Sequence, residues 1–181
     1  ADKNPNHHSV VVRIDFGQAS FLFTGDLQVG ESGKPGGLDS LLSEYAADAS
    51  SFDVDVLKVA HHGAENGTNQ ALLQVTRPCI AMLGVGDPTQ RGPGTAHDHG
   101  HPRLETMHML ASDSIGVSGH RPRLSVQAAP AGDSAFSPVA TDRAIFGTAW
   151  DGHFVVYGYK DGRYRVSTQT TGLDAHAIEC R

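Results

Sequence analysis

Hydrophobic and polar residues alternate at the start of the chain. Within residues 9–16, large apolar side chains recur at every second position, at Val10, Val12, Ile14 and Phe16. A period of two is typical of a strand with one buried face. Gly17 and Gln18 then give a turn signal before the short apolar run 20–24. The pattern therefore predicts an antiparallel hairpin over residues 9–24.

The next segments switch between helical and strand periods. After a glycine-rich loop, apolar side chains recur with the spacing of one helix face, at Leu38, Leu41, Leu42 and Tyr45. This stripe predicts an amphipathic helix. The apolar runs 54–60 and 79–85 predict two strands, and Lys58 is expected to be a strand residue with its amine in solvent. The second run is apolar throughout, which is typical of a strand covered on both faces.

Capping and proline signals predict two more helices. A short helix lies between the two strands, with Thr68 as its N-cap and Pro78 beyond its end. Pro102 opens another helix, whose apolar face carries Leu104, Met107, His108 and Ala111. His108 is therefore expected to be a core histidine. Residues 112–142 are rich in serine, proline, glycine and alanine and have no period, so they predict a loop excursion.

The C-terminal part returns to strand patterns. Closing strands are expected within residues 143–168, followed by a tail at 169–181. Aromatic residues recur there with the alternation of positions on the faces of a strand, at Trp150, Phe154, Tyr157, Tyr159 and Tyr164. For these rings, core or cross-strand packing is preferred over a base-stacking platform. The order of elements predicts one α/β domain over residues 1–181 with a mixed sheet, in which residues 1–111 carry the motifs.

Composition narrows the class of protein. The 181 residues carry 14 Lys and Arg against 20 Asp and Glu, and the net charge of −6 disfavours broad, non-specific binding of duplex DNA. The longest apolar run, 79–83, is far shorter than the ~20 residues of a membrane-spanning helix, so no membrane segment is expected. Cys79 and Cys180 have no C-x-x-C spacing and leave the redox compartment open.

Histidines are frequent, and they follow the ends of predicted strands. Of the 11 histidines, His61 and His62 follow one strand and three alternate in the run 97–101 after the next, while Asp26 follows the hairpin. Ligands of open α/β sheets bind outside the C-terminal ends of the strands. A carboxylate and several imidazoles at that edge suit a divalent metal. The alternative is that Asp26 caps a turn and that the histidines lie in surface loops.

Four segments together carry a resemblance to a known family. They are, in order, NHHSVVVRIDFGQASFLFTGD, DVDVLKVAHHG, IAMLGVG and GHPRLE. In this order they resemble the metallo-β-lactamase superfamily, and within it the branch of ComEC-type DNA-uptake proteins. The resemblance covers residues 4–111 and the closing strands at 143–168. Its specificity comes from the joint occurrence of TGD after a strand, LKVxHHG and GHP.

The resemblance implies an αββα sandwich with two divalent metal ions at one edge, zinc first and manganese as the alternative. Asp26 of TGD matches the aspartate that bridges the two metals. His62 of HHG matches a histidine ligand, and His61 is then its neighbour, as a further ligand or a substrate contact. His8 or Asn6 stands where many members place another histidine ligand.

Two further histidines are implied to lie beside the metals. His101 of GHP, with His99 nearby, matches a position that contacts the substrate or donates a proton to the leaving group. Two departures from the family pattern matter: Ala64 replaces the serine that usually follows HHG, and only 25 residues precede Asp26, whereas the family places its HxHxDH metal motif far upstream. The run 97–101 imitates that motif in composition but lacks its DH pair. The chain thus resembles the C-terminal half of such a domain.

These features predict a metal-dependent hydrolase, in which water activated by two metals attacks a phosphodiester, such as DNA, or another small ester. Hydrolysis of a lactone or an amide is the alternative reaction, and an inactive fragment or a degenerate binding domain is the alternative class. The expected partner is an N-terminal fragment with the remaining ligands, or a second copy of the chain. Alone, the chain is expected to be inactive, to hold substoichiometric metal, and to expose the apolar faces of the hairpin and of strand 54–60.

Overall fold

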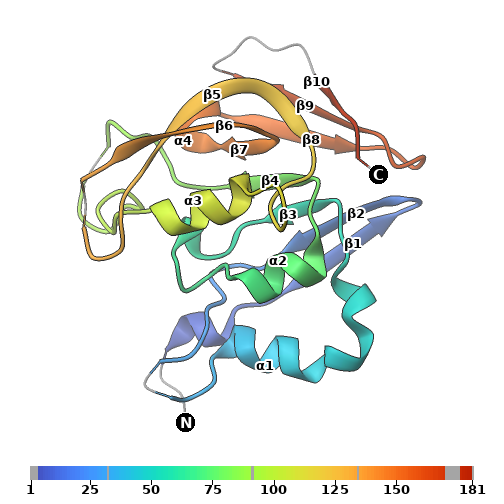
Figure 1. Ribbon diagram of the computed structural model, residues 1–181, viewed down its shortest axis with the longest axis horizontal. Coiled ribbons are helices and arrows are strands. Elements are labelled where there is room, and N and C mark those ends of the chain that lie inside the picture. Colours follow the sequence, from blue (N-terminus) through green and yellow to red (C-terminus); the bar gives the residue numbers. More distant parts are fainter. Residues whose placement is uncertain (1–3, 32, 91, 134, 170–175, 181) are drawn as a thin grey trace.

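The computed structural model describes residues 4–31, 33–90, 92–133, 135–169 and 176–180. Its central element is a five-stranded sheet in the order β1-β2-β3-β4-β7 (Figure 1). The strands are β1 (Val12–Phe16), β2 (Ala19–Phe23), β3 (Val56–Lys58), β4 (Ile80–Leu83) and β7 (Ile145–Gly147). β1 and β2 form the antiparallel hairpin, whereas the pairs β2-β3, β3-β4 and β4-β7 are parallel. The expected α/β fold with a mixed sheet is confirmed.

Helical segments lie before the first strand and between later strands. They are η1 (Pro5–His8), α1 (Gly37–Glu44), η2 (Ala46–Phe52), η3 (Ala60–Gly63), α2 (Gln70–Thr76), α3 (Leu104–Ala111) and α4 (Thr148–Asp151). The N-cap of α2 is Asn69, whose side chain accepts a hydrogen bond from the Leu72 N–H, and not Thr68 as expected. His108 is exposed on α3, so its assignment to the core is wrong: the buried face carries Thr106, Met107 and Leu110.

The sheet lies between the helices and a second sheet. Strands β8 (Phe154–Gly158), β9 (Tyr164–Thr168) and β10 (His176–Ile178) form this smaller antiparallel sheet. Phe21 meets Tyr164 edge-on at 5.9 Å between ring centroids, and Phe146 lies 6.1 Å from Phe154. Strand register puts Phe21 and Phe146 on the same face of the central sheet. The opposite face packs with α2 and α3, whose Leu73 and Met107 join the same core.

Residues 112–142, expected to be a loop excursion, contain two strands. β5 (His120–Ala128) and β6 (Ser137–Arg143) pair as a separate antiparallel ribbon that arches over the molecule (Figure 1). The loop expectation is therefore wrong for about half of this stretch. Arg121 fills a buried position and prolines 122 and 138 interrupt the strands, so the period of two is hidden in the sequence.

The two terminal nitrogens of the buried Arg121 guanidinium are hydrogen-bonded to acceptors of β7 and α4. Its Nη1 and Nη2 donate to the two carboxylate oxygens of Asp151 at 2.8 and 2.6 Å, and Nη1 also donates to the Ile145 carbonyl at 3.0 Å. Its guanidinium carbon lies 4.2 Å from the centre of the Phe146 ring. The Gly147 N–H donates to Asp151 as well. This pair ties the β5–β6 ribbon to β7 and α4.

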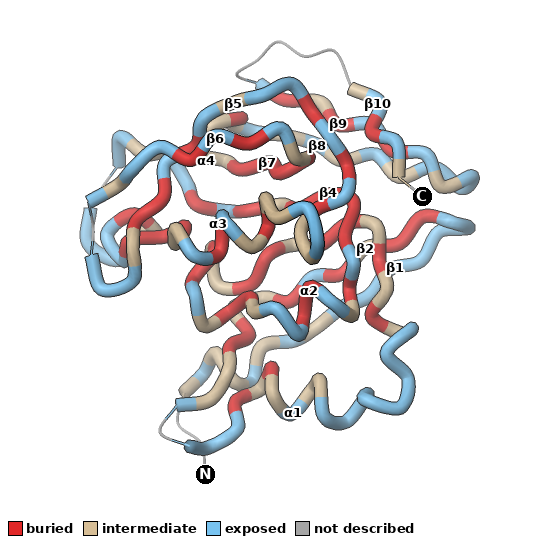
Figure 2. The backbone as a smooth tube through the Cα atoms, viewed as in Figure 1, coloured by how far each residue is buried: buried red, intermediate tan, exposed pale blue. Residues whose placement is uncertain are grey.

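One apolar face of the hairpin is open to solvent. Figure 2 shows β1 exposed along its whole length. Val10, Val12, Ile14 and Phe16 are 77, 43, 49 and 55% exposed. Strand 54–60 differs, because Val54, Val56, Leu57 and Val59 are at most 2% exposed. The expected exposure is thus confirmed for the hairpin and wrong for β3, which lies in the middle of the sheet and is covered on both faces.

The C-terminal tail is tied back to the central sheet. A disulfide joins Cys79, at the start of β4, to Cys180, 101 residues later. β10, which lies within the segment expected to be a tail, pairs with β9. Residues 170–175 and 181 of that tail lie outside the described part of the chain. In the ranges that are described, no helix has the length and apolar character needed to cross a bilayer.

Candidate active site

The best candidate site lies at the C-terminal ends of β2, β3 and β4. Asp26 follows β2 and His62 follows β3, and their side chains meet with 3.7 Å between His62 Nε2 and Asp26 Oδ1. His62 Nδ1 donates to the carbonyl oxygen of Gly84, just after β4. In the neutral ring this bond leaves the lone pair on Nε2, directed at the carboxylate. Metal-binding histidines are commonly oriented by such a hydrogen bond on their other nitrogen.

The turn that carries the two histidines is strained. His61 has φ 46° and ψ 47°, and His62 has φ 55° and ψ 20°, which is the left-handed region that side chains other than glycine rarely adopt. Such residues persist where the surroundings hold them, and they cluster at functional sites. Gly63 follows with φ 83°, and a Cβ there would come within 2.9 Å of Pro102. Glycine therefore lets the loop that carries His101 close against the histidine turn.

His61 sits in a cradle of amide side chains. Its Nδ1 is 3.1 Å from Asn66 Oδ1, and its Nε2 is 3.4 Å from Asn6 Nδ2. Both amides also contact Gln28 Oε1. Because both ring nitrogens are engaged, His61 has a fixed orientation, and ligation of a metal by Nε2 would require Asn6 to move. Asn66 and Gln28 escape sequence reasoning, because isolated polar loop residues give no periodic signal.

Lys58 belongs to the site, contrary to expectation. Its Nζ donates to the Gly25 carbonyl at 2.9 Å and lies 3.9 Å from Asp26 Oδ1, with the side chain 22% exposed. Burial lowers the pKa of this amine, and the Asp26 carboxylate opposes that shift. The signal in the sequence is a single cation inside the apolar run of β3. The apolar neighbours of Lys58 in the sequence indicate that its amine lies inside the fold and not in solvent.

The loop histidines extend the site as a row of rings. The ring centroid of His101 lies 5.3 Å from that of His61 and 6.2 Å from that of His99. Burial, with the nearby His61 and Arg103, lowers the pKa of His101 from 6.5 to about 4. His101 is thus neutral at neutral pH, and its Nδ1 is buried without a partner in the described chain. The neutral ring can offer a lone pair or one N–H, but it is not a protonated ring ready to act as a general acid.

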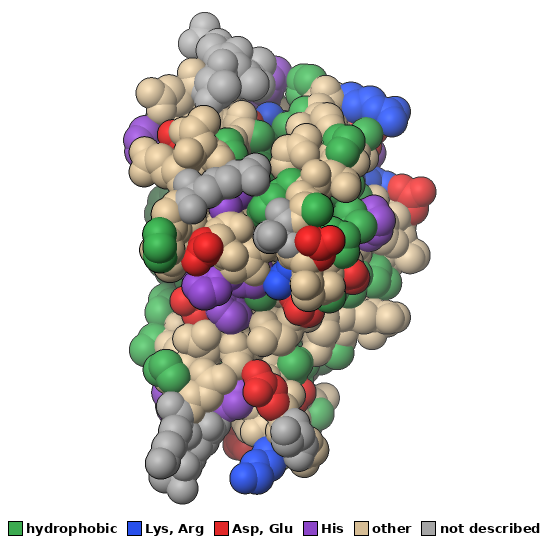
Figure 3. All heavy atoms as spheres, turned by 90° about the vertical axis from the view of Figure 1, so that its left-hand side faces the viewer, with side chains coloured by type: hydrophobic (Ala, Val, Ile, Leu, Met, Phe, Trp, Pro, Cys, Tyr) green, Lys and Arg blue, Asp and Glu red, His purple; other side chains and the backbone are tan. Residues whose placement is uncertain are grey.

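The predicted site residues do not all meet. His8 ends η1 and is exposed, and His99 is exposed in its loop. In the part of the chain that the structure describes, no three His, Cys, Asp or Glu side chains converge as a group that could hold a metal. Asp26 and His62 therefore fit as two ligands of a metal and no more. Figure 3 views the molecule from the left of Figure 1 and shows histidine side chains gathered beside acidic ones.

Comparison with known proteins identifies partial relatives. This chain is similar to part of two bacterial proteins. It is 32% identical over 81 residues to "Recombination protein 2" of Haemophilus influenzae, which is 45% of this chain and 9% of that protein. It is 26% identical over 112 residues to "ComE operon protein 3" of Bacillus subtilis, which is 62% of this chain and 12% of that protein.

The matched region is thus about a tenth of each relative. These relatives support the ComEC-like part of the resemblance described above. No family model matches the chain. No solved structure matches it either.

Proposed function

We propose that this chain forms part of a metal-dependent hydrolase of the metallo-β-lactamase type, acting on a phosphodiester such as DNA or on another ester. The observation that carries the proposal is the orientation of His62. Its Nδ1 is bound to the Gly84 carbonyl and its Nε2 faces Asp26 across 3.7 Å. A neutral imidazole and a carboxylate held in this way are a suitable pair of ligands for zinc, with manganese as the alternative.

In this proposal Asp26 and His62 hold the metal, which when bound supplies an activated water and a Lewis acid. Other residues of the chain hold the loop after β2 and the histidine rings in place. Lys58 fixes the loop after β2 through the Gly25 carbonyl. The amides of Asn6 and Asn66 hold the His61 ring. His101, neutral and buried beside the rings of His61 and His99, is suited to a hydrogen bond with the substrate.

The open face of β1 supports the need for a further segment. A continuous apolar stripe runs along Val12, Ile14 and Phe16, with Phe23 beside it at 36% exposure. Large exposed apolar patches mark surfaces that pack with another element. We propose that a segment with the HxHxDH motif covers this stripe and supplies the remaining ligands. The two-ligand set seen in the described residues favours an inactive fragment or binding domain as the second candidate.

The test compares the chain with and without its upstream segment. The joined protein should bind metal stoichiometrically and hydrolyse a simple phosphodiester, whereas the isolated chain should do neither. Asp26→Asn in the joined protein should lower metal content and hydrolysis together, because an amide supplies neither the charge nor the bridging geometry of a carboxylate. Asp142→Asn is the matched control, since Asp142 also faces a histidine, His120, at 3.6 Å. Full activity with metal retained in Asp26→Asn would contradict the proposal, and absence of both in the joined protein would favour the second candidate.

A further inference from the structure

The outer face of the smaller sheet carries aromatic and basic side chains. Along β8 the inner positions are apolar or glycine and pack on the central sheet, whereas the outer positions 155 and 157 point to solvent. Tyr157 is 47% exposed, and Tyr159, just after β8, is 38% exposed. Arg165 on β9 and Arg163, just before β9, are the neighbouring residues, and both are exposed. The core role expected for the aromatic series is therefore wrong for these two rings, whereas the cross-strand role applies to them.

Tyrosine and arginine are paired across the two strands. Tyr157 is directly opposite Arg165 in the register of β8 and β9. One step further, the Tyr159 N–H donates to the Arg163 carbonyl at 2.9 Å, and the guanidinium carbon of Arg163 lies 5.8 Å from the Tyr159 ring. Each of these cross-strand pairs places an aromatic ring beside a cation. The two pairs therefore form two successive rungs, roughly 7 Å apart along the strand.

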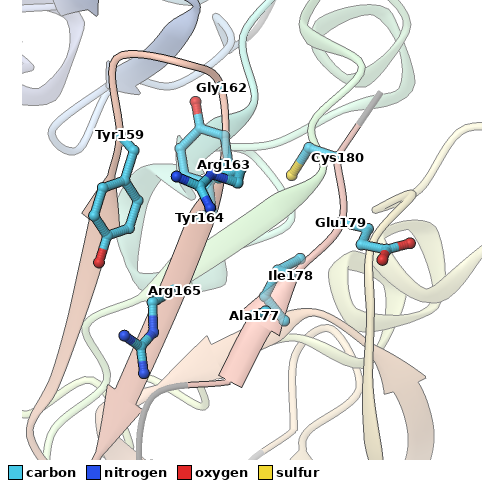
Figure 4. A pocket seen from close by; sticks show the side chains of 9 residues that line it. All are labelled: Tyr159, Gly162, Arg163, Tyr164, Arg165, Ala177, Ile178, Glu179 and Cys180. Atoms are coloured by element: carbon cyan, nitrogen blue, oxygen red, sulfur yellow. The ribbon is translucent and has the colours of Figure 1, made fainter.

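A hollow lies at one end of this face, between β9 and the end of β10. Its volume is about 610 Å³, within the usual range of ligand pockets. Tyr159, Arg163 and Arg165 line one side, and Ala177 and Glu179 line the other (Figure 4). The hollow is thus bounded by the same ring and cations that form the rungs.

Charge distinguishes this face from the rest of an acidic chain. Lys160, Arg163 and Arg165 place three of the chain's 14 Lys and Arg within six residues, although the net charge is −6. Asp161 pairs with Arg163 at 2.8 Å, but the two side chains are 53 and 78% exposed, and exposed pairs contribute little. A phosphate can replace such a partner at small cost.

We propose that this face binds single-stranded nucleic acid, with bases stacked on Tyr157 and Tyr159 and phosphates held by Arg163 and Arg165. Exposed rings beside a basic track are the features that bind unpaired strands with little sequence preference. A duplex hides the faces of its bases and could use only the cations. The face lies at the other end of β2 from Asp26, because the β8–β9 turn contacts the hairpin turn through the Gln18 N–H and the Lys160 carbonyl. The proposal is therefore independent of the hydrolase assignment.

The test measures binding of a fluorescent single-stranded oligothymidine to the 181-residue chain by anisotropy, in EDTA and low salt. The double variant Tyr157→Leu/Tyr159→Leu should bind at least about tenfold more weakly, whereas Tyr157→Phe/Tyr159→Phe should bind like the wild type. Arg163→Gln/Arg165→Gln should weaken binding and reduce the slope of log affinity against log salt by roughly 1.4. The matched control is Tyr45→Leu/Arg123→Gln, which removes an exposed ring and an exposed cation elsewhere.

Circular dichroism and the thermal midpoint establish that each variant is folded, so that loss of binding reports on the face. Wild-type affinity in the Leu double variant would overturn the proposal, because binding would then not use the rings. Equal affinity for a duplex of the same length would overturn it too. If the wild type binds no oligonucleotide at low salt, the proposal fails and the face becomes a candidate surface for a protein partner.

Discussion

In the part of the chain that the structure describes, His62–Asp26 and His120–Asp142 are separated by almost the same distance, but their surroundings differ. His62 and Asp26 are 3.7 Å apart, and His120 and Asp142 are 3.6 Å apart. His62 is held by a backbone carbonyl in a strained turn and keeps its second nitrogen for the carboxylate. His120 lies on an open ribbon, 59% exposed, and its Nε2 contacts Arg143. Proximity alone therefore does not mark a site. What differs is the lone pair that remains, because the bond to Gly84 leaves Nε2 of His62 available, whereas Nε2 of His120 already accepts from Arg143 at 3.0 Å.

The ion pairs also differ in their surroundings, and they give the largest expected effect on the free energy of unfolding. Asp151→Asn should lower the free energy of unfolding by about 3–5 kcal/mol, because it leaves the buried Arg121 guanidinium without its counter-charge. Asp161→Asn, at the exposed pair with Arg163, should cost at most about 1 kcal/mol. Urea unfolding followed by circular dichroism compares the two. Similar losses in both variants would show that burial is not the deciding factor.

The second expected effect separates the two histidines. In the protein joined to its upstream segment, His62→Gln should weaken Zn²⁺ binding by about 100-fold or more, since even outer partners of metal ligands are worth roughly 10–100-fold. His120→Gln should leave the affinity unchanged. Competition titration with a chelating dye measures both. An equal loss, or none in His62→Gln, would remove the distinction drawn between the pairs.

A third effect concerns pH and the buried histidine of the site. The unfolded chain protonates the His101 ring near pH 6.5, whereas the folded chain does so only at about pH 4. The unfolded state therefore binds more protons between these values, and the free energy of unfolding should fall by about 2 kcal/mol as the pH falls from 6.5 to 4. His101→Asn should flatten this part of the stability profile. The control His108→Asn, at an exposed position of α3, should leave it in place, and a profile unchanged by His101→Asn would contradict the assignment.

The smallest effect on stability is expected at the open hairpin. Ile14 is 49% exposed, so Ile14→Lys should change the free energy of unfolding by no more than about 0.5 kcal/mol. The same change should reduce self-association of the isolated chain, because it breaks the apolar stripe. Sedimentation velocity at several concentrations tests this. A large loss of stability would mean that the stripe is covered within the chain.

Much of the fold could be predicted from the sequence where one simple period governs the segment. The hairpin, the amphipathic helix at Leu38 and the apolar strand at Ile80 follow from periods of two and 3.6 and from continuous burial. β5 could not be recognised, because one of its buried positions holds Arg121, which is stabilised there by Asp151, thirty residues later. Long-range pairing of this kind leaves no local pattern. The same holds for the disulfide between Cys79 and Cys180.

The candidate site likewise has features that could be predicted from the sequence and features that could not. Asp26 and His62 could be predicted from their place after strands, and the structure brings them together. The amide side chains around His61 and the inward direction of the Lys58 side chain could not be predicted. Both depend on how three loops fold against each other. The pKa of His101 likewise follows from burial among other rings, which a sequence does not display.

The orientation of the His62 ring decides whether its Nε2 can bind a metal, and the nitrogen chemical shifts of the histidine rings report this orientation. Long-range proton–nitrogen spectra of the chain at neutral pH should show His62 with its proton on Nδ1, and addition of Zn²⁺ should shift its Nε2 signal while the signals of His120 stay in place. A proton on Nε2 of His62, or the same response to Zn²⁺ at both rings, would show that His62 is not held as a metal ligand.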